Sequence, residues 1–148
     1  MTDIELTQAE ADALIAMRKV CPQDRTWDMP DPGGKVIIPL TSEDRREQFT
    51  LDISRGRIDL RKGTYQNRAH KVFVLVRLDF GGQPHRNPDG AEVACPHLHL
   101  YRERYADKWA FELPPGVFAD TSDLLLTLDD FLRYCNIEPP QITGKLMA

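Results

Sequence analysis

The sequence predicts an α+β fold: an N-terminal helix, an antiparallel β-sheet meander of about five to six strands, and a C-terminal helix. Capped segments with helical spacing lie near both ends, and segments that alternate apolar and polar residues lie between them. Because the expected strands and helices are separated along the chain, both helices should pack on one face of the sheet. The 148 residues are enough for a single domain spanning 1–148.

The first helix is expected over residues 8–20. Thr7 is a good N-cap, and Glu10 stands three residues later, where it completes a capping box. Apolar residues recur at helical spacing behind this cap, and Pro22 prevents the helix from continuing. A loop rich in proline and glycine is expected over 22–35.

The middle of the chain predicts the strands of the sheet. Alternating or apolar runs place them at 35–40, 49–53, 58–60, 71–80, 97–101 and 108–113. Residues 54–56 are interpreted as a hairpin turn, and 71–80 is the most apolar run and therefore expected near the centre of the sheet. Residues 81–96 predict a long loop, in which Asn-Pro-Asp-Gly at 87–90 is a turn signal.

The last helix is expected over 128–136, with Thr127 as its N-cap. Four apolar residues fall on one face of this segment, and two prolines at 139–140 stop it. Residues 141–148 are expected to form a loose tail.

Composition excludes several classes of protein. Charged residues make up 28% and hydrophobic residues 41%, a balance typical of a globular chain. We expect no membrane span, because no apolar run approaches the necessary length, and no secretion signal, because the N-terminus is acidic. Three separated cysteines indicate reduced thiols, so a cytoplasmic location is expected. A net charge of −4 argues against a protein that coats DNA but is compatible with a small nuclease.

The candidate chemistry is concentrated between residues 85 and 101. Strand alternation places His97, His99 and Tyr101 on one face, with leucines on the other. If 71–80 and 97–101 are neighbouring strands, Arg77 and Asp79 lie beside the two histidines. His85 and Arg86 come from the intervening loop. The competing interpretation is that these polar residues simply form the solvent-exposed face of a sheet.

The residues Arg77-x-Asp79, the string PHRNPDG and the string PHLHLY resemble the signature of small bacterial toxins of the TumE-like group. The chain also resembles uncharacterised bacterial and phage proteins with an HxNPDG…PHxHxY pattern. The TumE-like resemblance covers about 49–101 and implies the RelE-like and barnase-like endoribonuclease fold. It marks Arg77, Asp79, His85, His97 and His99 as catalytic. The chain departs from those toxins in having His85-Arg86 where they have paired histidines, and in its C-terminal helix.

The first functional hypothesis is therefore a toxin-like endoribonuclease that needs no metal or other cofactor. One histidine, His97 or His99, would act as base on the RNA 2′-hydroxyl and the other as acid. Arg77 would stabilise the phosphorane and Asp79 would orient an imidazole. Substrate contacts are predicted for Lys108 and Arg86, through phosphate, and for Tyr101, through base stacking. A cognate antitoxin would be the protein partner.

Two other hypotheses stay open. The acidic balance is compatible with a non-enzymatic phage or mobile-element protein, an anti-defence inhibitor or an antitoxin, that binds a host protein. The third hypothesis is a metal site built from His85, His97 and His99 together with Asp89 or Cys95, because two imidazoles in an HxH strand can share one ion.

Overall fold

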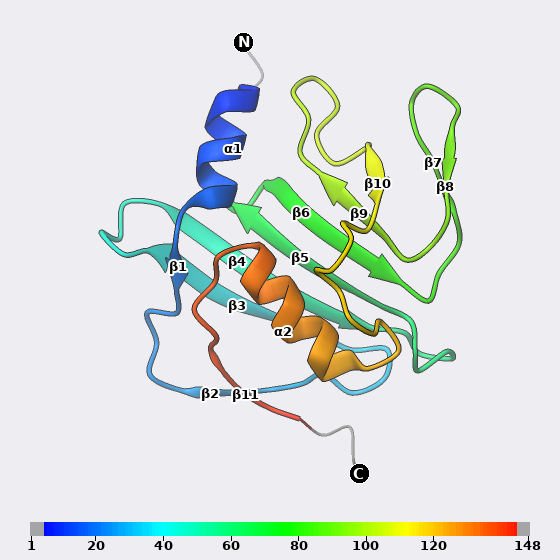
Figure 1. The fold of residues 1–148 in the computed structure, drawn as a ribbon. Coiled ribbons are helices and arrows are strands. Elements are labelled where there is room, and N and C mark those ends of the chain that lie inside the picture. Colours follow the sequence, from blue (N-terminus) through cyan, green and yellow to red (C-terminus); the bar gives the residue numbers. More distant parts are fainter. Residues whose placement is uncertain (1–4, 145–148) are drawn as a thin grey trace.

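The computed structural model describes residues 5–144, and its centre is a seven-stranded antiparallel sheet with the order β1-β3-β4-β5-β6-β9-β10 (Figure 1). The predicted α+β class is confirmed, although the main sheet has more strands than the expected five to six. Its strands are β1 (Lys19–Val20), β3 (Lys35–Ser42), β4 (Gln48–Arg55), β5 (Gly63–Ala69), β6 (Phe73–Phe80), β9 (His97–Leu100) and β10 (Ala110–Glu112). Two small sheets pair β2 (Thr26–Asp28) with β11 (Gln141–Thr143), and β7 (His85–Arg86) with β8 (Glu92–Val93).

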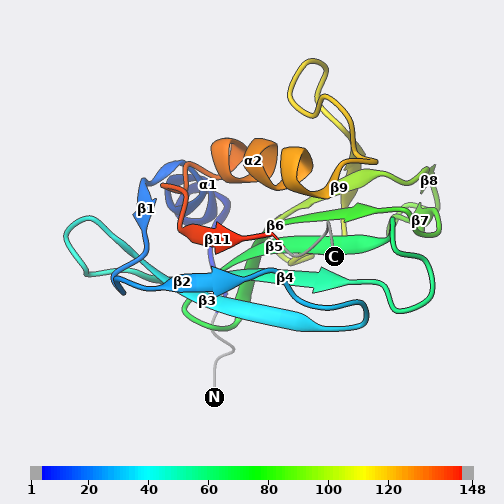
Figure 2. The same ribbon diagram turned by 90° about the horizontal axis from the view of Figure 1, so that it is seen from below.

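Both helices, α1 (Gln8–Ala16) and α2 (Leu124–Tyr134), lie on the same side of the main sheet (Figure 2). The core fills the space between the sheet and these helices. The Tyr65 ring is at its centre, 5.0 Å from the Phe80 ring and 6.1 Å from the Phe131 ring, and its hydroxyl donates to the Leu124 carbonyl. Because one face of the sheet is buried in this way, the polar residues of strands that alternate apolar and polar residues project from the other face.

The capping box of α1 is confirmed, since Thr7 and Glu10 exchange side-chain and backbone hydrogen bonds. The expected extent of this helix is wrong, because α1 ends at Ala16 and not at residue 20. The next residues form β1, in which Lys19 pairs with Ser42 of β3. Pairing with the sheet satisfies the backbone groups of β1, so tertiary contacts override the helical spacing of this segment.

The predicted return strand at 58–60 is also wrong. β4 continues to Arg55, and Ile58 is 95% exposed in the turn that follows. A hydrogen bond from the Gly56 amide to the Lys62 carbonyl closes this turn, and the returning strand is β5. The two apolar residues of the turn are separated by one residue, as alternating residues of a strand would be. β5 has no such apolar alternation, because one of its faces is polar and the other includes glycine, alanine and a tyrosine.

Both C-terminal predictions need correction. Helix α2 begins four residues earlier than expected, with Asp123 as its N-cap, and Thr127 lies buried inside it. The tail is not loose over Gln141–Thr143, because these residues form a parallel pair with β2. The loop predicted at 22–35 therefore contains a strand too. The rest of the tail from 145 lies outside the described residues. Within residues 5–144, no helix has the length and apolar character that crossing a membrane requires.

Candidate functional site

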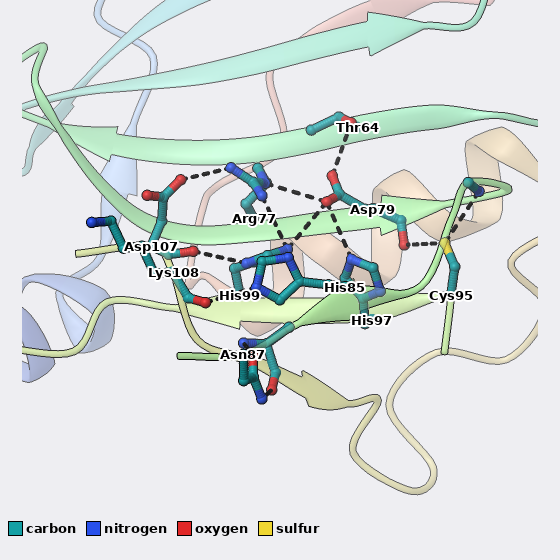
Figure 3. A network of polar contacts seen from close by, with 12 residues as sticks. Thr64, Arg77, Asp79, His85, Asn87, Cys95, His97, His99, Asp107 and Lys108 are labelled. Atoms are coloured by element: carbon teal, nitrogen blue, oxygen red, sulfur yellow. Dashed lines mark hydrogen bonds and ion pairs between the residues drawn. The ribbon is translucent and has the colours of Figure 1, made fainter. Parts of the chain in front are cut away.

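Strands β6 and β9 are antiparallel neighbours, which meets the condition stated for the candidate site, and their register aligns Arg77 with His99 and Asp79 with His97. Directly opposed residues of an antiparallel pair project to the same face. Four of the predicted residues therefore meet on the sheet face opposite the helices, where Figure 3 shows their side chains pointing toward one another.

Asp79 lies at the centre of this cluster. Its Oδ2 atom is 3.3 Å from Nε2 of His97 and 3.2 Å from Nε2 of His99, and Oδ1 accepts a hydrogen bond from the Thr64 hydroxyl at 2.9 Å. Burial by itself opposes ionisation of this carboxyl. The charge of Arg77 and the hydrogen bond from the Thr64 hydroxyl outweigh burial and hold the Asp79 pKa below its usual range. Asp79 is therefore an anion at neutral pH.

Arg77 links the cluster to the loop that follows β9. Its Nη1 donates to Asp107 at 2.6 Å, its Nη2 lies 3.0 Å from Nε2 of His99, and its Nε is 3.4 Å from Oδ2 of Asp79. Asp107 was missed at the sequence level. It lies in a loop with no alternation to reveal its direction, and Arg104 and Ala106, which precede it, both have positive φ.

The hydrogen bonds to backbone carbonyls assign the histidine tautomers. Nδ1 of His99 lies 2.8 Å from the Asp107 carbonyl, and Nε2 of His85 lies 2.8 Å from the Lys108 carbonyl. A carbonyl oxygen can only accept, so each of these nitrogens carries a proton. In the neutral rings, Nε2 of His99 and Nδ1 of His85 therefore hold the lone pairs.

The two strand histidines are deeply buried. His97 is 3% and His99 is 1% exposed, whereas Arg77, Asp79 and His85 are only partly buried. Desolvation lowers the pKa of His97, although the neighbouring Asp79 carboxylate opposes this effect. His97 is therefore a neutral imidazole at neutral pH, and the surface of the cluster consists of Arg77, Asp79 and His85.

The β7–β8 hairpin brings His85 onto the cluster. The His85 ring centre lies 4.6 Å from that of His99 and 5.9 Å from that of His97. The predicted turn at 87–90 is confirmed by a hydrogen bond from the Gly90 amide to the Asn87 carbonyl. The Asn87 side chain both accepts from and donates to the backbone of Ala110 in β10, which fixes the hairpin against the sheet edge.

In the part of the chain that the structure describes, none of the three residues predicted to bind substrate has a side-chain hydrogen bond to this cluster. The Tyr101 side chain is buried, and its hydroxyl bonds to both backbone groups of Leu6, so this ring is not free to stack on a base. Arg86 is exposed and pairs with Glu92 of β8, and the Lys108 side chain is exposed beside the site. Tyr101 departs from the predicted face because β9 ends at Leu100.

The metal-ligand set suggested by the sequence also changes. Asp89 accepts from the Ala91 amide within its own turn, and the Cys95 thiol lies between the backbones of Gly82 and Asp79. Among the described residues, the side chains able to share one ion are Asp79, His97 and His99, whose ligand atoms all lie within 4.8 Å of one another.

A family of unknown function, DUF6978, matches residues 6–137. The chain belongs to this family. The DUF6978 match runs from the residue before the α1 cap to Ile137 beyond α2, and it includes every residue of the cluster described above. No curated protein and no solved structure matches the chain.

Proposed function

We propose that this DUF6978 protein is a toxin-like endoribonuclease that cleaves RNA without a metal. The observation that supports the proposal is the alignment of Arg77 and Asp79 with His99 and His97, with His85 placed above them. An arginine beside several imidazoles is suited to binding a phosphodiester and moving protons around it. The resemblance of PHRNPDG and PHLHLY to TumE-like toxins makes RNA the substrate of choice.

In this proposal His85 is the base, because it is the cluster imidazole nearest the surface and its Nδ1 holds a lone pair. It takes the proton of the 2′-hydroxyl, and the 2′-oxygen attacks the adjacent phosphorus. The leaving 5′-oxygen takes a proton from the imidazolium form of His99, whose Nε2 then carries a second ring proton beside the Asp79 carboxylate. Arg77 stabilises the charge of the phosphorane. The products are a 2′,3′-cyclic phosphate and a free 5′-hydroxyl.

The test is cleavage of single-stranded RNA by purified protein in the presence of a chelator, with the end groups of the products identified. His85→Ala should reduce the rate by about 100-fold or more, as expected for loss of a general base. His70→Ala is the matched control, because His70 lies on the surface and pairs with Glu47. Intact RNA with the wild-type protein, or equal rates for both variants, would overturn the proposal.

The protein partner expected for such a toxin is a cognate antitoxin. Expression of the wild-type chain alone should arrest growth, and expression of His85→Ala should not. If RNA stays intact and the protein instead recovers one stoichiometric host protein, the non-enzymatic interaction protein suggested by the net charge of −4 is the better description.

A further inference from the structure

We propose that Asp79, His97 and His99 form a binding site for one transition-metal dication, with Zn²⁺ as the best fit. The inference goes beyond the proposed RNA cleavage, since metal binding by these side chains needs no RNA. Two imidazole nitrogens and one carboxylate are the ligands of many zinc and non-haem iron sites, and they disfavour Mg²⁺ and Ca²⁺, which prefer oxygen ligands alone.

The distances between the ligand atoms fit a small ion. Tetrahedral ligands at about 2.0–2.1 Å from zinc lie roughly 3.3–3.4 Å from one another. Oδ2 of Asp79 is already 3.3 Å from Nε2 of His97 and 3.2 Å from Nε2 of His99. These two distances therefore match those of a zinc site, and the three ligand atoms all lie within 4.8 Å of one another.

Two of the three ligands, His99 and Asp79, have the supporting hydrogen bonds that are usual behind a metal site. A metal-bound histidine usually donates its other ring proton to a carbonyl or carboxylate, which fixes the ring and the tautomer. His99 does this through Nδ1, which donates to the Asp107 carbonyl and leaves the Nε2 lone pair facing Asp79. The Thr64 hydroxyl holds the other oxygen of Asp79.

Without a metal, Arg77 supplies the positive charge at this position. An unprotonated Nε2 of His99 and the Asp79 carboxylate both present lone pairs at 3.2 Å, which is repulsive unless a cation lies near both. Arg77 approaches both groups, at 3.0 Å and 3.4 Å. It also has a second partner, Asp107 at 2.6 Å, with which it can stay paired when an ion replaces it at His99.

This competition between Arg77 and the ion gives a sharp prediction for metal affinity. Protein freed of metal with a chelator should bind about one Zn²⁺ per chain in calorimetry, and Co²⁺ in its place should give the visible absorption of a low-coordinate imidazole site. Asp79→Asn should abolish both signals. Thr64→Val, which removes only the hydrogen bond to Asp79, should weaken binding by roughly 10- to 100-fold. Arg77→Gln should strengthen it.

The control is His70→Ala, which removes the surface histidine and should leave affinity unchanged, and circular dichroism checks the fold of each variant. Absence of both signals with the wild-type protein would overturn the inference. So would Zn²⁺ binding that survives Asp79→Asn, or that is weakened by Arg77→Gln. Because the RNA assay is run in chelator, failure here leaves the proposed cleavage standing. If both hold, added Zn²⁺ should inhibit cleavage, because the ion displaces Arg77.

Discussion

At the scale of single residues, Lys19 is the most unusual side chain outside the site. It is fully buried, and its ammonium group donates to three carbonyl oxygens, those of Ile15, Met17 and Cys135. The Phe49 ring centre lies 5.0 Å away. These contacts join the end of α1 to the end of α2. Burial lowers the pKa of Lys19 from 10.5 to about 8.

The depressed pKa of Lys19 predicts how stability changes with pH. Between about pH 8 and 10.5 the unfolded chain holds a proton on Lys19 that the folded chain has lost. The free energy of unfolding should therefore rise with pH across this window, by up to about 3 kcal/mol. Denaturation with urea at several pH values should show this rise in the wild type and not in Lys19→Met. The exposed Lys35→Met is the control and should keep the wild-type slope.

Tyr101 is predicted to act in folding and not in RNA binding. Its buried hydroxyl accepts from the Leu6 amide at 3.0 Å and donates to the Leu6 carbonyl at 2.9 Å. Tyr101→Phe leaves both backbone groups unsatisfied and should lower the free energy of unfolding by about 1–3 kcal/mol. Tyr105→Phe, which alters an exposed ring, should change it little. Equal stability of the two variants in urea denaturation would contradict this assignment.

At the scale of elements, the β7–β8 hairpin decides where His85 lies. The hairpin is short, and two hydrogen bonds between Asn87 and Ala110 attach it to β10, together with the bond from His85 to the Lys108 carbonyl. The hairpin is therefore a separately anchored element, and the position of His85 over the cluster depends on that anchor.

Asn87→Ala should release this hairpin while the main sheet stays folded. The amides of Gly90 and Ala110, which donate to the backbone carbonyl and the side chain of Asn87, should exchange hydrogen faster, by a factor corresponding to about 1–3 kcal/mol. Amides in β4 and β5 should keep their protection. Asp89→Ala alters the exposed turn alone and is the matched control. Unchanged exchange at Ala110 in Asn87→Ala would show that the hairpin is held by other contacts.

At the scale of the whole molecule, one face of the sheet forms the core and the other carries the candidate site. One face carries the helices and the core, and the other carries the polar cluster, so the site rests on strands whose opposite face is packed. Near the C-terminus, β11 pairs with β2 and so joins two segments far apart in the sequence. The Thr143 carbonyl also accepts a hydrogen bond from the Met29 amide at 2.9 Å.

Removing residues 141–148 should therefore destabilise the protein. Loss of the hydrogen bonds between β11 and β2 is expected to cost about 1–3 kcal/mol, measured as a lower midpoint in urea denaturation. Removing residues 145–148 leaves β11 intact and is the control. If both truncations gave the same midpoint, β11 would contribute nothing to stability.

Local physical chemistry made part of this protein predictable from its sequence. The capping box of Thr7 and Glu10 depends on residues three apart, and the shared face of His97 and His99 depends on the two-residue period of a strand. The turn at 87–90 likewise follows from its own residues. The extent of the elements was less predictable, because Lys19 and Val20 leave the helix for a partner strand that is distant in sequence.

The sequence by itself determined the α+β class, the capping box of the first helix and the face that carries His97 and His99. Only the tertiary structure decided that β6 and β9 pair in the register that opposes Asp79 to His97, that Asp107 reaches Arg77, and that Tyr101 turns into the core. The reason is that period and capping are set within a few residues. Register and loop direction are set by contacts between residues 8 to 95 positions apart, which no local pattern encodes.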